Sequence, residues 1–367
     1  MYFFDEYEKY KDFDILGSVK SVNEISVERT LSKHRLNIED FVVLISQSAI
    51  PYLEQMAQKA CDIKRQYFGN TIHLFTPMYL SNYCNNNCLY CGFNHDSKIL
   101  RYQMSYEEIE KEAKAIAKTG LKHILILTGD APSKATASYL ESCCQILKKY
   151  FSSITIEIYA IETEGYKKLI DAGVDGLTIY QETYNKTLYK ELHPKGPKKN
   201  FRFRLDAPQR GAIAGMRNVN IGPLLGLDHW QRDIFFTALH AKWLEHKYPE
   251  TDISISLPRM RPYDGCYKPK HLVSDRDMVQ MILAIRIFLN RCGITISTRE
   301  NETFRNNIMK LGITKISAGS TTAVGGHTLV ENKNNQFEIS DKRSVDEIVT
   351  YLEKNQIQPL FKDWERF

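Results

Sequence analysis

The stretch TIHLFTPMYLSNYCNNNCLYCGF, residues 71–93, joins an apolar run typical of a buried strand to a loop that carries three cysteines. Cys84, Cys88 and Cys91 stand in a C-x3-C-x2-C spacing, which lets three thiolates converge on one metal centre. Ordinary electron-carrying clusters and structural zinc sites use four protein ligands. No other cysteine lies nearby, so the spacing predicts a four-iron cluster with one iron open to another molecule. A zinc site completed by a distant histidine or aspartate is the alternative.

Short apolar runs alternate with helical patterns along the chain beyond this point, which indicates a parallel βα barrel. The eight expected strands span residues 71–80, 122–129, 153–161, 174–181, 218–222, 252–257, 294–298 and 314–319. The helices expected with them lie near residues 105–119, 134–150, 164–172, 201–214, 230–247, 275–290, 301–310 and 344–354. An incomplete six-strand barrel with two appended strands is the competing architecture.

We therefore expect an α/β fold, a (βα)8 TIM-type barrel over residues 71–330 with a helical extension over residues 1–70 before it. Within the extension, Asn37 is a typical helix start and Gly69 a typical helix end. Residues 331–367 are expected to form a helical tail packed on the barrel.

The composition, with 43% hydrophobic and 25% charged residues, is typical of a soluble globular protein. The net charge of +5 is spread along the chain, so we expect no nucleic-acid partner, and the basic stretch Lys190–Arg210 is interpreted as a solvated loop. No apolar run is long enough to span a bilayer, and the acidic start does not resemble a secretion signal. We expect a cytoplasmic protein without a membrane partner, whose eight cysteines are free thiols or metal ligands.

Barrel active sites lie at the carboxyl ends of the strands, and this rule selects polar candidates near the cysteine loop. They are Tyr90, Thr128, Gly129, Asp130, Glu157, Glu182 and Arg204. From the residues alone, Asp130 is as easily a turn or helix-start residue. Glu157 is as easily on an outward face of its strand, and Arg204 is as easily on an exposed helix.

The cysteine triplet beyond the first barrel strand resembles the signature of the radical S-adenosylmethionine (SAM) superfamily. This resemblance implies that Cys84, Cys88 and Cys91 hold a 4Fe-4S cluster, whose free iron binds the amino and carboxylate groups of the methionine part of SAM. It also implies that the reduced cluster cleaves SAM to a 5′-deoxyadenosyl radical, chemistry that belongs to the cofactor while the protein orients and shields it.

The resemblance also assigns roles to residues around the cluster. Tyr90 stands where the superfamily places an aromatic ring near the adenine. Thr128, Gly129 and Asp130 stand where its Gly-Gly-Glu segment binds the methionine ammonium. Asp130 replaces the glutamate of that segment, which keeps the negative charge but shortens its reach. Glu182 is expected near the ribose or amino groups, and Arg204 near the methionine carboxylate.

Longer motifs resemble the aromatic-amino-acid lyase branch, and most of all the tyrosine lyases of thiamine biosynthesis. In chain order they are YCNNNCLYCGF, LTGDAP, YQETYN, HPKGPKKNFRFRLDAPQRGAIAGMRNVNIGPLLGL, LPRMRP, STRE and ISAGSTTAVGGH. The resemblance implies cleavage of the Cα–Cβ bond of L-tyrosine to 2-iminoacetate and 4-methylphenol. It also implies a flavodoxin- or ferredoxin-type electron donor and a complex with thiazole synthase.

A tyrosine carboxylate needs a partner, and the planar fork of an arginine suits it. Arg299 in the STRE segment is the first choice, and Ser317 at the end of the last strand adds a hydrogen bond. Arg259 and Arg261 of LPRMRP are alternatives, with an ordinary surface ion pair as the plain interpretation. The loop Gly319–Gly326 is less readily interpreted as a phosphate cradle.

Three other functions stay open. The tyrosine lyase of iron-only hydrogenase maturation carries further cysteines in a C-terminal extension, whereas no cysteine follows Cys292 here, which favours the thiamine branch. A tryptophan lyase is the second alternative. A non-enzymatic electron-transfer protein would use the cluster as a relay, but such clusters have four protein ligands.

Overall fold

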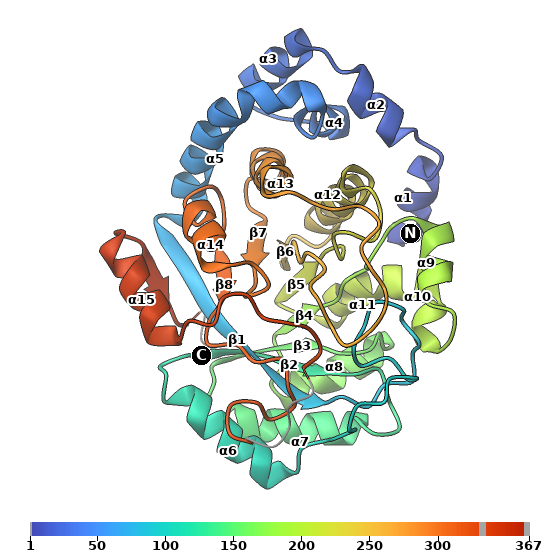
Figure 1. Ribbon diagram of the computed structural model, residues 1–367, viewed down its shortest axis with the longest axis vertical. Coiled ribbons are helices and arrows are strands. Elements are labelled where there is room, and N and C mark those ends of the chain that lie inside the picture. The colour runs from blue at the N-terminus through green and yellow to red at the C-terminus, as the bar shows by residue number, and fades with distance from the viewer. Residues whose placement is uncertain (1, 330–334, 363–367) are drawn as a thin grey trace.

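The computed structural model describes residues 2–329 and 335–362. Its centre is a closed barrel of eight parallel strands (Figure 1). They are β1 (Thr71–Ser81), β2 (His123–Thr128), β3 (Ser153–Glu157), β4 (Gly176–Thr178), β5 (Asn218–Ile221), β6 (Asp252–Ser256), β7 (Gly293–Ile296) and β8 (Lys315–Ser317). Strand β1 pairs with both β2 and β8, which closes the barrel and confirms eight strands over the six-strand alternative.

Helices surround the strands and cover their apolar side chains. They are α6 (Tyr106–Ala117), α7 (Ala137–Leu147), α8 (Thr163–Ala172), α11 (Ala207–Ala214), α12 (Trp230–Lys247), α13 (Asp275–Phe288), α14 (Glu302–Ile308) and α15 (Val345–Lys354). Side chains alternate along each strand, so Ile124, Val219 and Ile255 face the helices and are fully buried. Each of these helices is too short or too polar to cross a bilayer, and this holds for every helix among the described residues.

The helices before the barrel form an arc along one of its sides (Figure 1). They are α1 (Phe3–Tyr10), α2 (Ile15–Ser21), α3 (Glu24–Ser32), α4 (Ile38–Leu44), the 3-10 helix η1 (Gln47–Tyr52) and α5 (Leu53–Phe68). Helix α5 packs on α13, and α2 packs on α12. The predicted start at Asn37 is confirmed, because its side chain accepts a hydrogen bond from the Asp40 amide. Helix α5 ends at Gly69, whose φ of +64° suits glycine.

The sequence predicted a helical C-terminal segment. The structure differs, because a strand follows α15. This strand, β9 (Gln358–Leu360), pairs in parallel with residues 71–73 of β1. His73 already pairs with Lys315 of β8, so β9 lies on the side of β1 that β2 occupies further along. The longer β1 thereby finds backbone partners for its first residues, which β2 does not reach.

The basic stretch Lys190–Arg210 is not the solvated loop that we expected. It runs from the end of α9 (Lys186–Leu192) through η2 (Pro197–Lys199) and α10 (Phe201–Leu205) into α11. Arg204 and Arg210 are buried. The guanidinium of Arg210 donates to the backbone carbonyls of Ile161 and Phe203, at 2.8 and 2.7 Å. Charge composition alone does not reveal such internal partners, and for this reason the prediction was wrong.

A buried ion pair fastens the segment that follows the eighth strand to the barrel. Arg305 of α14 and Asp341 lie 2.5 Å apart, and neither side chain is exposed to solvent. Arg305 also donates to the Ser317 carbonyl at 2.5 Å. Removing one partner of such a pair leaves the other charge buried and uncompensated.

We expect Asp341→Ala to lower the free energy of unfolding by about 3–5 kcal/mol, because the Arg305 charge then has no carboxylate. Urea denaturation followed by far-UV circular dichroism measures this loss. Asp252→Ala is the matched control, since it breaks an exposed pair with Arg217, and exposed pairs contribute little. Similar losses in the two variants would contradict a special role for the buried pair.

Candidate active site

A cavity opens at the carboxyl ends of the strands and continues into the barrel lumen. Its empty space measures about 1720 Å³, the open mouth included. The cysteine loop and the segment after β2 line its mouth. Inward-facing residues of the strands line its depth. The cavity therefore reaches from the cysteine loop into the depth of the barrel.

The three cysteines of the loop after β1 gather at this mouth. Cys84 and Cys91 line the cavity, and Cys88 is buried beside Tyr90. Burial raises the pKa of all three thiols, and the Asp130 carboxylate and Cys91 add to the effect on Cys84, whose pKa reaches about 11. A bound cation favours the thiolate forms, so the residues fit a four-iron cluster with three protein ligands.

The remaining cysteines do not join this group. Cys143 and Cys144 are buried within α7, and Cys292 is buried before β7. Cys61 of α5 donates to the Lys310 carbonyl, and Cys266 is exposed. Cys84, Cys88 and Cys91 thus share the loop after β1, while the other five cysteines lie elsewhere in the fold.

The ring of Tyr90 is fixed beside Cys88 by a histidine that sequence analysis did not select. His193 Nδ1 donates to the Tyr189 carbonyl at 2.7 Å, so its Nε2 accepts from the Tyr90 hydroxyl at 2.6 Å. Burial lowers the pKa of His193 to about 3, which keeps the imidazole neutral in this role. The Lys198 ammonium lies 5.8 Å from the centre of the Tyr90 ring.

The segment after β2 approaches the cysteine loop through its backbone. A Cβ atom on Gly129 would stand 2.3 Å from the Tyr83 carbonyl, so only glycine fits there. Asp130 accepts from the Asn86 side-chain amide at 2.6 Å, and its backbone carbonyl accepts from the Asn85 amide. The Thr128 hydroxyl is buried and has no hydrogen-bond partner among the described residues. A polar ligand at this edge would find that hydroxyl and the Asp130 carboxylate.

Glu182 lies after β4 at the centre of a buried charge cluster. It forms ion pairs with Lys198 at 2.5 Å and Arg204 at 3.6 Å, and Arg204 also donates to the Tyr180 carbonyl. Burial alone would raise the pKa of Glu182, but Lys198 and Arg204 hold it below its ordinary value. Its φ of +71° is uncommon for a residue with a side chain, and such strain is concentrated at functional sites.

Glu157, at the end of β3, faces the cavity rather than the surrounding helices. Burial and the nearby Glu182 raise its pKa to about 7, although Arg299 opposes the shift. Arg299 enters the same cavity from the loop after β7, with its guanidinium 3.4 Å from the centre of the Phe337 ring. In the described part of the chain, no carboxylate pairs with Arg299, so its planar fork can take a ligand carboxylate.

The other residues that were predicted to bind the substrate lie in different places. Ser317 lines the lumen and accepts from the Thr298 amide at 3.0 Å, and Arg261 lines the cavity beside Ser340. Arg259 does not line the cavity, because its guanidinium is held by Glu300 and Asp275. Arg299, Arg261 and Ser317 therefore line the same cavity, and Arg259 lies outside it.

Polar side chains line the lumen beside apolar ones such as Phe75, Leu125 and Leu127, which sequence analysis did not predict. The inward-facing residues include Thr155, Thr178, Asn218, Asn220, Ser254, Ser256 and Thr295. The Asn220 amide donates to Ser256 at 2.8 Å, while its Oδ1 is buried without a partner among the described residues. Strands such as NVNI and DISIS alternate polar and apolar residues, and this period of two was the signal that could have found these residues.

Comparisons with known proteins agree with this geometry. Residues 78–235 match the Radical SAM superfamily, and residues 256–358 match the Biotin and Thiamin Synthesis associated domain. The chain is 35% identical to the 2-iminoacetate synthases of Salmonella typhimurium and Escherichia coli K12, over 99% and 100% of this chain and 97% of each relative. The X-ray structure of the FeFe-hydrogenase maturase HydG from Carboxydothermus hydrogenoformans superposes with a TM-score of 0.85 at 29% identity, over 98% of this chain and 82% of that chain.

The superfamily match begins in β1 and contains the cysteine loop, and the full-length matches extend through the residues that line the rest of the cavity. A 4Fe-4S cluster and SAM are the cofactors of proteins with this domain and these relatives. With the gathered thiols, the closed barrel and identity over nearly the whole length, the chain belongs to the radical SAM superfamily and, within it, to the family of the 2-iminoacetate synthases.

Proposed function

We propose that this protein cleaves the Cα–Cβ bond of L-tyrosine to give 2-iminoacetate and 4-methylphenol, as a radical SAM lyase of thiamine biosynthesis. Near-full-length identity to two 2-iminoacetate synthases supports the reaction. One structural observation carries the proposal: a single continuous cavity joins the three-cysteine loop to the guanidinium of Arg299. An arginine fork without a protein carboxylate suits an amino-acid substrate.

At the mouth of the cavity, Cys84, Cys88 and Cys91 would hold the cluster. Asp130 would accept hydrogen bonds from the methionine ammonium of SAM, and Glu182 and Arg204 would bind its other polar groups. When bound, the reduced cluster and SAM supply a radical that takes a hydrogen atom from the substrate. The protein's part is to hold the substrate close to that radical and to exclude water.

In the same cavity, Arg299 after β7 would bind the tyrosine carboxylate, and Ser317 at the end of β8 would add a hydrogen bond. The phenol would then reach the polar side chains of the lumen, where Asn220 Oδ1 lacks a partner among the described residues. Glu157 has a pKa of about 7, so it exchanges protons near neutral pH and is suited to take one from the tyrosine ammonium. This arrangement would turn the amino group toward the mouth of the cavity.

The proposal extends to the partners and the compartment. We infer a flavodoxin- or ferredoxin-type electron donor, association with thiazole synthase, and a place in the cytoplasm. The hydrogenase-maturation type of tyrosine lyase is the second candidate, favoured by the likeness to HydG. The 35% identity over 97% of the length of two 2-iminoacetate synthases favours the thiamine type. A tryptophan lyase would require the cavity floor to receive an indole.

The reaction itself is the first test. Anaerobic incubation of the reconstituted enzyme with SAM, a reductant and tyrosine should give 4-methylphenol, 5′-deoxyadenosine and glyoxylate, the hydrolysis product of 2-iminoacetate. Chromatography with mass detection measures all three. Tryptophan in place of tyrosine should give no cleavage product. Release of carbon monoxide from tyrosine, or cleavage of tryptophan, would overturn the assignment.

Arg299→Lys should uncouple the enzyme, because lysine keeps the charge but loses the planar fork that orients the substrate. We expect 5′-deoxyadenosine still to form, while 4-methylphenol falls about 10- to 100-fold, the effect of losing a charge-assisted hydrogen bond. The ratio of the two products measures the coupling. Arg261→Lys, at the wall of the same cavity, should leave the ratio near that of the wild type. The opposite result would place the carboxylate at Arg261.

Cys88→Ala should lose most of the bound iron and all formation of 5′-deoxyadenosine, because three thiols supply every protein ligand of the proposed cluster. Iron analysis and visible absorption measure the first effect. Cys266→Ala is the control, since Cys266 is exposed on the loop between β6 and α13. A cluster that survived Cys88→Ala, or failed to form in Cys266→Ala, would contradict the ligand set.

A further inference from the structure

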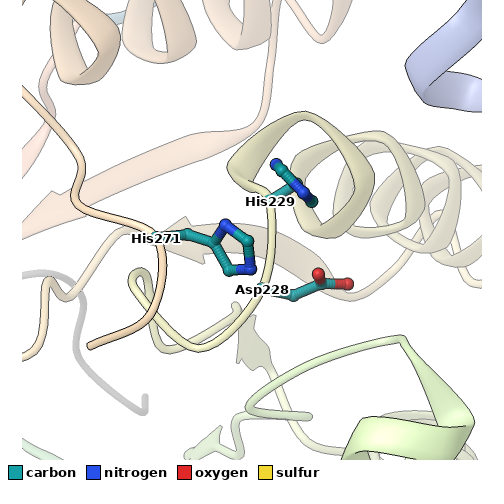
Figure 2. Close-up of side chains that lie close together, drawn as sticks. All are labelled: Asp228, His229 and His271. Atoms are coloured by element: carbon teal, nitrogen blue, oxygen red, sulfur yellow. The ribbon is translucent and has the colours of Figure 1, made fainter. Parts of the chain in front are cut away.

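A second group of possible metal ligands lies outside the cavity, on the same face of the barrel. Asp228 and His229 immediately precede α12, and His271 lies on the loop between β6 and α13 (Figure 2). One ligand atom from each residue lies within 4.8 Å of the other two. Asp228 is buried, His271 is half-buried and His229 is exposed, so the group is open to solvent on one side. None of the three lines the cavity.

We propose that Asp228, His229 and His271 bind a divalent transition-metal ion, with Zn²⁺ as the preferred occupant. Two imidazoles and one carboxylate are a ligand set that zinc uses, and imidazole suits borderline ions rather than Mg²⁺ or Ca²⁺. Three protein ligands leave the fourth tetrahedral position to water. The inference is independent of the lyase function, because the group lies apart from the cavity.

The two imidazoles lie side by side in a tilted contact, so a side chain has to rotate before both rings can bind one ion. Their ring centres lie 3.9 Å apart, and neither ring makes a hydrogen bond within residues 2–329 and 335–362. Tetrahedral zinc brings ligand atoms to roughly 3.3 Å from one another, given bond lengths near 2.0–2.1 Å. The exposed His229 can supply that contraction by rotating its side chain, without movement of the barrel.

The carboxylate is held in place by its own partners. Asn185 donates to Asp228 Oδ2 at 3.0 Å, and Arg232, one turn along α12, pairs with the same oxygen. Both contacts end on Oδ2, so Oδ1 remains for a metal ion. Hydrogen-bonded carboxylates are usual in metal sites, because the second partner fixes their direction. The Arg232 charge, in contrast, opposes a bound cation.

The site would join two loops that pack on the cysteine loop. The amide of His271 donates to the Gly226 carbonyl at 3.3 Å, which places the loop between β6 and α13 against the loop before α12. Both loops contribute to the apolar cluster around Cys88: Leu227 comes from the loop before α12, and Tyr267 from the loop between β6 and α13. A metal ion would therefore fasten one loop to the other beside this cluster.

Zinc binding to the anaerobically reconstituted holoenzyme tests the proposal, because the cluster then occupies the other metal-binding thiols. Competition with a chromophoric zinc chelator should show one tight site per chain. His229→Ala and His271→Ala should each weaken zinc binding by about 100-fold or more. Loss of a residue that only supports a metal ligand already weakens binding by about 10- to 100-fold. His246→Ala, at the exposed end of α12, is the matched control and should bind like the wild type.

Two further measurements separate a built site from zinc held elsewhere. X-ray absorption at the zinc edge should show nitrogen and oxygen near 2.0–2.1 Å and no sulfur near 2.3 Å, which excludes Cys266 on the same loop. Arg232→Gln should bind zinc several-fold more tightly, because it removes the opposing charge. Sulfur ligation, or unchanged affinity in His271→Ala, would overturn the site, and an Arg232→Gln variant that bound no tighter would remove Asp228 from it.

Limited proteolysis reports on the loop itself. Trypsin cleaves after Lys270, directly before His271, whereas Pro269 protects the bond after Lys268. Zinc should slow cleavage at Lys270 in the wild type and leave it unchanged in His271→Ala. Equal rates with and without zinc in the wild type would show that the ion does not join the two loops.

Discussion

The alternation of polar and apolar side chains along the barrel strands is the constraint on which the rest of the structure depends. Outward residues such as Ile124 and Val219 pack under the helices, while inward residues such as Asn220 and Ser256 meet across the lumen. An ordinary βα barrel fills its interior with branched apolar side chains. Here short polar side chains of β3 to β7 share the lumen with larger residues of β1 and β2, such as Phe75 and Leu125, and a cavity remains between them.

The charges in the cavity fall into two groups with different consequences. Glu182 forms ion pairs with Lys198 and Arg204. These two cations lower the pKa of the Glu182 carboxyl group, which therefore stays ionised. Among the described residues, Glu157 and Arg299 have no ion-pair partner as close as these, and burial and Glu182 raise the pKa of Glu157 to about 7. A satisfied cluster near the cysteines is suited to position a ligand. Two charged residues without an ion-pair partner are suited to change their charge or their partner when a substrate arrives.

The sequence predicted the parts of this arrangement that depend on local pattern. The eight strands, the cysteine triplet and the cap at Asn37 each follow from a few neighbouring residues, and the structure contains all of them. It did not predict Lys198, His193 or Phe337, because their roles depend on contacts with residues far away in the chain. The basic stretch was misinterpreted for the same reason, since Arg210 finds its carbonyl partners only after the chain has folded.

The segment after β8 contacts both a cysteine of the loop after β1 and Arg299 after β7. Gln336 accepts from the Tyr79 hydroxyl at 2.9 Å and donates to the Cys91 sulfur at 3.6 Å, and its neighbour Phe337 lies under the Arg299 guanidinium. Hydrogen bonds to cluster sulfurs tune a cluster's reduction potential, while the aromatic ring orients the arginine. The buried pair of Arg305 and Asp341 fastens this segment to the barrel. One piece of chain therefore contacts both the proposed cluster ligand Cys91 and the proposed substrate-binding Arg299.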